Sequence, residues 1–348
     1  MSVHNLDLEM ISDDPDLMKQ PPGGTIEVMS ARDGSRLRYG VWPVPIADRR
    51  GAVLLLHGRT EFIEKHLETI AEKIGHTSTF RAAAQGRLLP CVADLLARRF
   101  SVFTLDWRGQ GLSDAMNGNP LKGHVRDYDE YLDDLDLFVR IVVHREDNLP
   151  FFVLGHSMGA HLALRYEHLH PEAVKGMIMC APMIKLLGRR VIGVLSQIAS
   201  RSLVAIGFRN NYIPGQAAYW EARRNFEGNP LTSDPCRYKL TTDWIDRNAN
   251  LAVGPPTFSW LSAMFRSIAV THQTTFRAAI ITPVLIVAAG RDSVVSTDGA
   301  KEYSERLPGF EFVSIDGAQH EILHERDDLR DAFWAAFDQF VEEILSPS

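Results

Sequence analysis

The chain has 348 residues, 45% of them hydrophobic, which is enough to bury one large α/β core with an appended subdomain. Its formal net charge of −7 gives no global electrostatic reason to bind nucleic acid, so we expect no nucleic-acid partner. The three cysteines are too few and too scattered for a disulfide framework or a metal cluster, and their odd number is typical of a reducing compartment.

The first 24 residues are acidic and interrupted by prolines, and we interpret them as an N-terminal tail. They lack the basic stretch followed by an apolar stretch that marks a secretion signal. No apolar run of the chain approaches the roughly 18 residues that a membrane span needs. We therefore expect a cytoplasmic protein whose contact with the inner face of a membrane is only peripheral.

Eight short apolar stretches predict strands, and helix-like segments alternate with them from residue 52 onward. Several stretches are apolar on both faces, which is typical of buried parallel strands. This order predicts a doubly wound, mostly parallel eight-stranded sheet whose ligand site lies at the carboxyl ends of the strands. The predicted strands are residues 25–30, 36–42, 52–57, 101–106, 151–154, 176–180, 283–289 and 310–315.

The alternation of strands and helices stops after Cys180 and resumes only at Pro283. The residues between them include helix-like pieces that are rich in Arg, Trp and Tyr. We interpret residues 183–277 as a helical cap inserted into the core. The core is then predicted to have two parts, residues 25–182 and residues 278–348.

A serine between two glycines follows the fifth predicted strand. In the sequence GHSMG, from Gly155 to Gly159, an apolar strand precedes Ser157 and a helix that begins with small residues follows it. This context is typical of a nucleophile elbow, in which the turn strains the backbone at the serine and the glycines let strand and helix approach closely. A plain strand-to-helix loop is the alternative. We predict that Ser157 is a catalytic nucleophile.

A serine hydroxyl is a poor nucleophile, so this prediction requires an acid and a histidine further along the chain. Asp292 stands just beyond the apolar stretch PVLIVAA, and His320 lies in the loop after the next strand. His320 would take the proton of Ser157 while Asp292 fixes the imidazole tautomer. Asp298 and Asp316 are alternative acids that follow their strands less directly. Because no group of ligand side chains has metal-site spacing, we expect neither a metal nor another cofactor.

Acyl transfer also needs hydrogen-bond donors for the oxygen that becomes negatively charged. The sequence LLLHGRTEF places His57, Gly58 and Arg59 at the end of an early strand. We assign the two donors to the backbone amides of Arg59 and Met158. We expect His57 to support this loop and not to act as a base.

Five motifs along the chain, HGRTEF, DWRGQGLSD, GHSMGA, GRDSVV and GAQHEIL, resemble the α/β-hydrolase superfamily. The resemblance is to its monoacylglycerol lipase and bacterial lysophospholipase L2 branch, and it extends from about residue 25 to about residue 341. It implies an α/β-hydrolase fold with an inserted cap. It also implies a serine esterase that releases a fatty acid from a glycerolipid with one acyl chain. Gln110 in DWRGQGLSD stands where many relatives have histidine, and we expect this change to be structural.

The stretch between Gly58 and Ser101 is longer than such relatives usually have. Removing about residues 72–92 would join LETIA to ADLLARRF as one amphipathic helix, so we predict an insertion there. One interpretation is an extra flap over the acyl site. We favour the other, a tolerated surface excursion.

Other chemistries remain open, because one scaffold of this kind hosts many reactions. The alternatives are peptide hydrolysis, C–C bond hydrolysis and perhydrolysis. A peptidase should have a cap carboxylate for the substrate amine, and Glu221 and Glu227 are the only glutamates in the predicted cap. A non-catalytic ligand-binding member is disfavoured because the predicted triad is complete.

The predicted cap is strongly basic. It contains twelve basic and five acidic residues, a net charge of +7 that leaves −14 for the rest of the chain. Residues 189–208, RRVIGVLSQIASRSLVAIGF, have arginines near the ends of a mostly apolar helical stripe formed by Val191, Leu195, Ile198, Ser202 and Ile206. The cap arginines either pair with the acidic core or face lipid phosphates. We predict a small-molecule lipid ester as substrate and peripheral contact with an anionic membrane surface.

Overall fold

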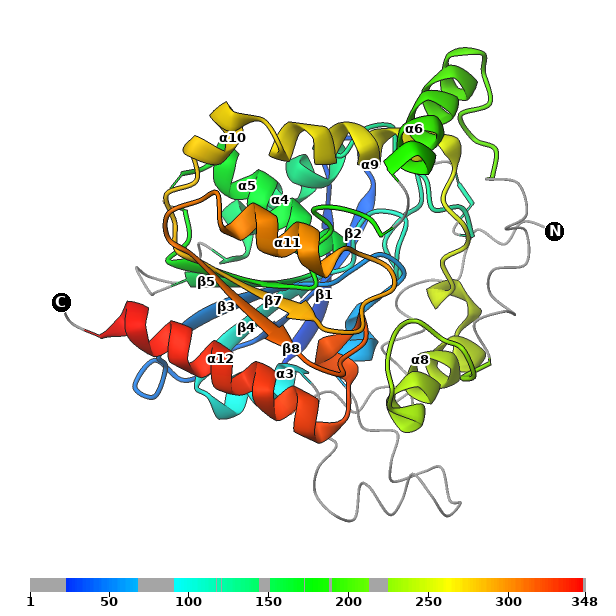
Figure 1. Ribbon diagram of the computed structural model, residues 1–348. Coiled ribbons are helices and arrows are strands. Elements are labelled where there is room, and N and C mark those ends of the chain that lie inside the picture. The colour runs from blue at the N-terminus through cyan, green and yellow to red at the C-terminus, as the bar shows by residue number, and fades with distance from the viewer. Residues whose placement is uncertain are drawn as a thin grey trace.

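The computed structural model describes residues 23–67, 91–116, 118–119, 121–143, 151–171, 173–187, 190–212 and 225–346. One eight-stranded sheet runs through its centre in the order β1-β2-β4-β3-β5-β6-β7-β8 (Figure 1). The strands are β1 (Thr25–Ser30), β2 (Arg36–Trp42), β3 (Gly51–Leu56), β4 (Phe100–Leu105), β5 (Phe151–His156), β6 (Gly176–Cys180), β7 (Val284–Ala289) and β8 (Phe310–Ile315).

The first two strands are antiparallel to their neighbours, and β4, β3, β5, β6, β7 and β8 are all parallel. The predicted mostly parallel eight-stranded sheet is therefore confirmed. The largest difference is at β5, which was expected to end at Leu154 but continues to His156. This histidine is polar but buried, and it pairs with Cys180 of β6. Because a polar residue is not typical of a buried strand, the sequence pattern predicted the end of β5 too early.

Helices cover both faces of the sheet, as Figure 1 shows. On one face lie α4 (Asp129–Ile141), α5 (Met158–Leu169) and α11 (Thr297–Ser304), and on the other lie α3 (Cys91–Ala97) and α12 (Asp327–Leu345). Alternate side chains of β5 enter the two cores, because successive residues of a strand point to opposite faces. Val153 packs in the first core, whereas Phe152 and Leu154 pack in the second.

The described residues between β6 and β7 include four α-helices. They are α6 (Arg190–Ala205), α8 (Pro235–Arg247), α9 (Phe258–Thr271) and α10 (Thr274–Ala278). Helix α9 packs against α5 and α6, and α8 packs beside the short 3-10 helix η1 (Ile63–His66). The start of α8 is fixed by Asp234, whose carboxylate accepts the N–H groups of Cys236 and Arg237. The cap boundaries at 183 and 277 stay a prediction.

Two predicted segments lie largely outside the described residues. They are the tail, of which residues 23 and 24 are described, and the insertion at about 72–92, of which Cys91 and Val92 are described as the start of α3. Within the described ranges, no helix combines the length and the apolar character that a membrane crossing requires.

Candidate active site

Ser157 lies at a sharp turn between β5 and α5. Its φ of 50° and ψ of −109° are strained for a residue with a side chain, as expected of a nucleophile elbow. A Cβ atom at Gly159 would lie 2.1 Å from the carbonyl oxygen of Leu56 on β3. The absence of a side chain at Gly159 thus lets α5 approach the sheet closely enough to form this turn.

The hydroxyl of Ser157, the ring of His320 and the carboxylate of Asp292 form a hydrogen-bonded chain. The Ser157 Oγ lies 3.1 Å from the His320 Nε2, and the His320 Nδ1 lies 2.8 Å from the Asp292 Oδ2. Asp292 follows β7 and His320 follows β8, so neighbouring strands present the two side chains at the same edge of the sheet. The structure therefore brings together all three predicted triad residues.

The local structure fixes the orientation of the Asp292 carboxylate. Its second oxygen accepts the N–H groups of Val294 and Val295, at 2.7 Å and 2.9 Å. Burial alone would raise the pKa of Asp292, but the hydrogen bond and charge of His320, together with these N–H groups, hold it below its ordinary value. Neither alternative acid, Asp298 or Asp316, has a hydrogen bond to His320 in the described part of the chain.

The predicted oxyanion donors follow two adjacent parallel strands, β3 and β5. Met158 is the first residue of α5, so its N–H has no acceptor within the helix. Arg59 lies in the loop after β3, and the amides on both sides of it are hydrogen-bonded. The Gly58 N–H donates to the Glu61 Oε2 at 2.5 Å, and the Thr60 N–H donates to the Gln110 Oε1 at 2.6 Å. This arrangement is compatible with the assigned role, which stays a proposal.

His57 is fully buried and is the first residue of the loop after β3. Its Nδ1 lies 2.8 Å from the Gly58 carbonyl oxygen, and its own carbonyl accepts the indole N–H of Trp107 at 2.9 Å. The side chain of Arg59 donates to the Gly254 carbonyl at 2.6 Å and lies over the ring of Trp260. These contacts fit the expected supporting role of His57, and they connect the loop to the segment between α8 and α9.

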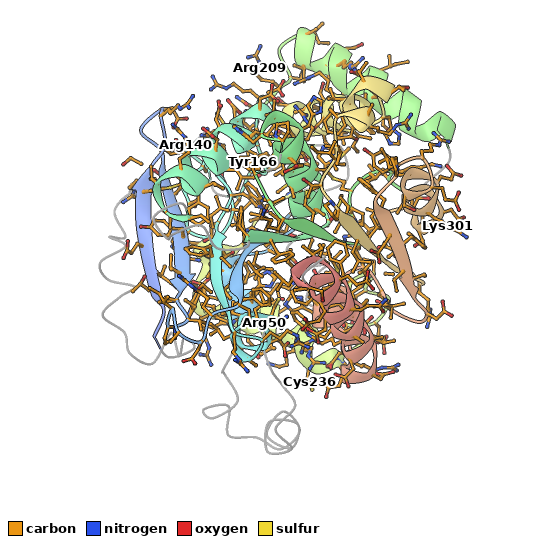
Figure 2. All side chains as sticks on the ribbon, turned by 90° about the vertical axis from the view of Figure 1, so that its left-hand side faces the viewer. Arg50, Arg140, Tyr166, Arg209, Cys236 and Lys301 are labelled. Atoms are coloured by element: carbon orange, nitrogen blue, oxygen red, sulfur yellow. The ribbon has the colours of Figure 1, made fainter. Side chains whose placement is uncertain are left out.

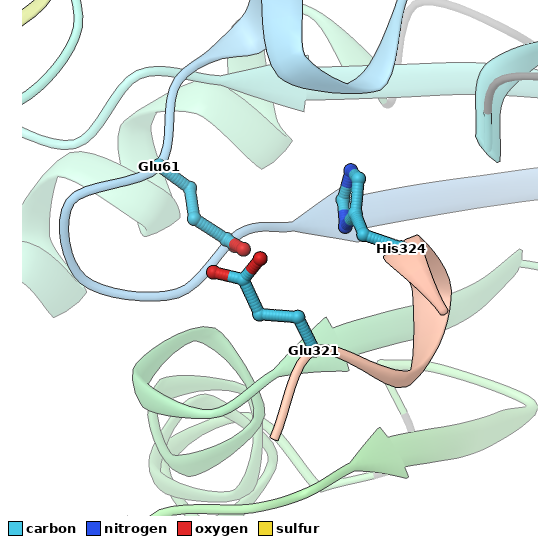
Figure 3. A group of neighbouring side chains, drawn as sticks. All are labelled: Glu61, Glu321 and His324. Atoms are coloured by element: carbon cyan, nitrogen blue, oxygen red, sulfur yellow. The ribbon is translucent and has the colours of Figure 1, made fainter. Parts of the chain in front are cut away.

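A buried ionic cluster lies below the loop, and the sequence analysis missed it. The Lys65 Nζ lies 3.1 Å from the Glu61 Oε1 and 2.7 Å from the Glu321 Oε2. Figure 3 shows Glu61, Glu321 and His324, whose ligand atoms lie close enough together to suit a metal ion. Because the Lys65 ammonium already bonds to both carboxylates, we interpret this group as an ion-paired cluster.

The cluster also connects the three loops of the site through His156, the residue before the elbow serine. The His156 Nδ1 lies 3.1 Å from the Glu61 Oε2, and its Nε2 lies 3.1 Å from the carbonyl oxygen of His320. Burial lowers the pKa of His156, but the charge and hydrogen bond of Glu61 raise it above its ordinary value. The one signal in the sequence was the i, i+4 spacing of Glu61 and Lys65, which is also common on solvated helix faces.

A pocket lies beside these loops, between α8 and the core. It opens to solvent. Thr60 and Glu321 contribute to its wall, and they are the chain neighbours of Arg59 and His320. The pocket thus adjoins the candidate site and has both apolar and polar walls. The other residues that line it are Lys65, Leu231, Tyr238, Thr241, Thr242, Ile245 and Val253.

Gly159→Ala is expected to destabilise the protein and to lower its esterase rate. The added methyl group meets the Leu56 carbonyl at 2.1 Å, and this overpacking should cost about 1–3 kcal/mol despite the better helix propensity of alanine. Thermal unfolding and turnover of a soluble ester measure the two effects. Gly34→Ala is the control. Its added methyl group has no atom within 4 Å, so the substitution is disfavoured only by the positive φ of residue 34. Equal unfolding temperatures for parent and Gly159→Ala would contradict the proposed close packing.

Comparison with known proteins agrees with this geometry. The Hydrolase_4 family, described as serine aminopeptidase, S33, matches residues 81–327. Lysophospholipase L2 of Escherichia coli strain K12 is 29% identical over 263 residues, which cover 73% of this chain and 76% of that protein. Monoacylglycerol lipase of Mycolicibacterium smegmatis is 27% identical over 300 residues, which cover 84% of this chain and 88% of that protein.

A solved structure shares the fold. A soluble variant of monoglyceride lipase from Saccharomyces cerevisiae superposes with a TM-score of 0.71, covering 95% of this chain and 97% of that chain at 20% identity. The family match extends over well more than half of the sequence and includes all three residues of the hydrogen-bonded chain. The protein therefore belongs to the Hydrolase_4 family and is a serine hydrolase of the α/β-hydrolase fold.

Proposed function

We propose that the protein is a carboxylic ester hydrolase of the lipase and esterase type, and that it cleaves the acyl ester of a single-chain glycerolipid. The substrate would be a lysophospholipid or a monoacylglycerol. The observation that carries the chemistry is the hydrogen-bonded chain from the Ser157 Oγ through His320 to Asp292. The names of the two relatives above support the choice of substrate.

The geometry supports a two-step reaction through an acyl-enzyme. His320 takes the proton of Ser157 as the hydroxyl attacks the ester carbonyl, and it then returns the proton to the departing glycerol oxygen. Asp292 stabilises the charged imidazole. The backbone amides of Arg59 and Met158 donate to the carbonyl oxygen as its negative charge develops. Water then releases the fatty acid by the same steps with the roles of nucleophile and leaving group exchanged.

A panel of substrates tests this proposal. Purified protein is offered lysophospholipids and monoacylglycerols of graded chain length, short soluble esters and aminoacyl anilides, with Ser157→Ala as the control. We expect Ser157-dependent release of fatty acid from the glycerolipids. Cleavage of the anilides alone would replace the ester proposal by the aminopeptidase activity in the family's description. Of the two cap glutamates that a peptidase could use, Glu227 is exposed and Glu221 lies outside the described residues, while Glu321 in the pocket is already paired with Lys65.

We further propose that α6 and the turn after it contact an anionic lipid surface. Ile198, Ile206 and Phe208 are exposed there, with 57%, 68% and 47% of their surface accessible. Arg201 and Arg209 are exposed beside them and form no ion pair within the described ranges. Figure 2 shows Arg209 at the outer edge of the molecule. Exposed apolar side chains next to cations match a surface of acyl chains and phosphates.

Other cations of the predicted cap are paired, as the alternative interpretation required. Among the described residues, ion pairs that join that region to the core include Lys185 with Glu302, Arg237 with Asp327, and Arg266 with Asp127. The pairing therefore accounts for part of the basic charge, and Arg201 and Arg209 are the described cations that best fit a lipid contact.

The double variant Arg201→Gln, Arg209→Gln is expected to bind anionic liposomes about thirtyfold more weakly, because each charge near the surface contributes about 1 kcal/mol and every 1.4 kcal/mol is a factor of ten. Its turnover of a short soluble ester should be unchanged. Binding should also fall as salt is raised, because exposed charges are screened over about 8–10 Å near physiological ionic strength. Sedimentation with vesicles of graded phosphatidylserine content measures the binding. Lys301→Gln, Arg326→Gln is the control with the same change in charge, and equal binding by the two double variants would count against the α6 contact.

A further inference from the structure

The motif DWRGQGLSD has no part in the proposed triad, yet it forms a tight turn against residues 57–63, the proposed oxyanion loop. It follows β4, and Gly109 and Gly111 adopt φ values of 73° and 54°. A Cβ atom at Gly111 would lie 2.1 Å from the Oδ2 of Asp106. The backbone of the turn therefore packs closely against the Asp106 carboxylate.

Two side chains of this turn accept hydrogen bonds from the backbone of the proposed oxyanion loop. The Asp106 Oδ1 accepts the N–H of Ile63 at 2.9 Å, and the Gln110 Oε1 accepts the N–H of Thr60 at 2.6 Å. Gln110 is 3% exposed, so water competes little for this bond. The turn therefore holds the loop at both Thr60 and Ile63.

The bond from Gln110 acts on a strained part of the loop. Thr60 has a φ of 68°, in the left-handed region that a β-branched residue rarely adopts. Such a conformation persists only when its surroundings fix it, and it is common at functional sites. The Arg59 N–H lies between two backbone N–H groups that are hydrogen-bonded. The Gly58 N–H donates to the Glu61 carboxylate, and the Thr60 N–H donates to the Gln110 side chain. The carbonyl oxygen of the peptide group that carries the Arg59 N–H lies 2.8 Å from the His57 Nδ1, so loss of the Thr60 bond removes one of several restraints on the direction of this N–H.

We infer that Gln110 is a positioning residue of the oxyanion hole, which acts through the Thr60 amide on the direction of the Arg59 N–H. This inference rests on the proposed ester hydrolysis. The glutamine side chain contributes only its carbonyl oxygen to the loop. A neutral histidine can also accept a hydrogen bond through a ring nitrogen, whereas the side chain of methionine, of similar length to glutamine, is at most a weak acceptor.

Replacing Gln110 by methionine and by histidine tests the inference at pH 8. Gln110→Met is expected to lower kcat on a soluble ester about tenfold to a hundredfold while KM stays within about threefold, because a misdirected donor weakens transition-state binding. Gln110→His should recover most of the lost kcat. The matched control is Gln273→Met, since Gln273 is an exposed glutamine just before α10. Unfolding temperatures of all variants show whether any loss comes from misfolding.

Two results would overturn the inference. One is parental kcat in a folded Gln110→Met variant, and the other is a Gln110→His variant no faster than Gln110→Met. The rate at which a fluorophosphonate labels Ser157 is measured in parallel, because the phosphonyl oxygen uses the same donors and the probe requires no particular substrate. If the parent protein reacts with the probe at Ser157 but cleaves no glycerolipid ester, the proposed function is wrong. The labelling rates of the Gln110 variants still test the inference in that case.

Discussion

Ser157→Ala and His320→Ala are each expected to lower kcat by about a thousandfold or more, because nucleophile and base act as one unit. The 3.1 Å contact between the Ser157 Oγ and the His320 Nε2 provides the path for the proton. Asp292→Asn is also expected to be severe, since an amide would favour the wrong tautomer of the imidazole. Initial rates on a soluble ester and labelling by a fluorophosphonate probe measure all three variants.

The assignment of the acid has its own controls. Asp316→Asn and Asp298→Asn should keep near-parental rates, because neither carboxylate has a hydrogen bond to His320 within the described residues. Near-normal rates in Asp292→Asn together with a large loss in Asp316→Asn would show that the acid is wrongly assigned. Unfolding temperatures are needed for Asp292→Asn, because this carboxylate also accepts the N–H groups of Val294 and Val295.

The sequence predicted those parts of the fold in which apolar side chains are buried and polar side chains are exposed. The central strands are apolar on both faces because the sheet is covered on both sides, so they stood out as short apolar runs. Ser157 and Asp292 come soon after such strands, His320 lies in the loop after the edge strand β8, and the carboxyl ends of parallel strands meet at one edge of the sheet. The triad contacts could therefore be predicted without any knowledge of distances.

The parts that the sequence did not predict are polar residues inside the molecule. Glu61, Lys65 and Glu321 look like surface residues in the sequence, because charged side chains are rarely buried unless they are paired. Their partners are distant in the chain, and only the folded topology brings them together. The same is true of Gln110, whose role depends on an amide of another loop. Patterns of hydrophobicity carry no information about such pairs.

Lys65→Met is expected to lower the free energy of unfolding by about 3–5 kcal/mol near neutral pH, because it leaves two buried carboxylates without their cation. Burial lowers the pKa of Lys65, but the charges of Glu321 and Glu61 raise it above its ordinary value. A raised pKa contributes stability that is complete below the unfolded value of about 10.4 and is lost only as the pH rises through the folded value. The ion pairs therefore contribute fully from pH 5 to pH 8.

The loss should also depend on pH in a defined direction. Burial raises the pKa of Glu61, but Lys65 and then His156 hold it well below its ordinary value. In the parent, this contribution is present above the unfolded value of about 4.3 and is lost only as the pH falls through the folded value. Without Lys65, burial is opposed mainly by His156, so the Glu61 carboxyl takes up a proton more readily. Parent and variant should therefore differ most at pH 8 and less toward pH 5.

Thermal unfolding followed by circular dichroism at several pH values measures both effects. Lys239→Met is the matched control, because Lys239 pairs with Asp243 on the surface, where 59% of its side chain is exposed and a pair contributes only about 0–1 kcal/mol. If Lys65→Met were as stable as this control at pH 8, the buried cluster would not depend on the ammonium. A difference that widened toward pH 5 would mean that the carboxylates do not gain protons when Lys65 is removed, and the charges assigned to the cluster would be wrong.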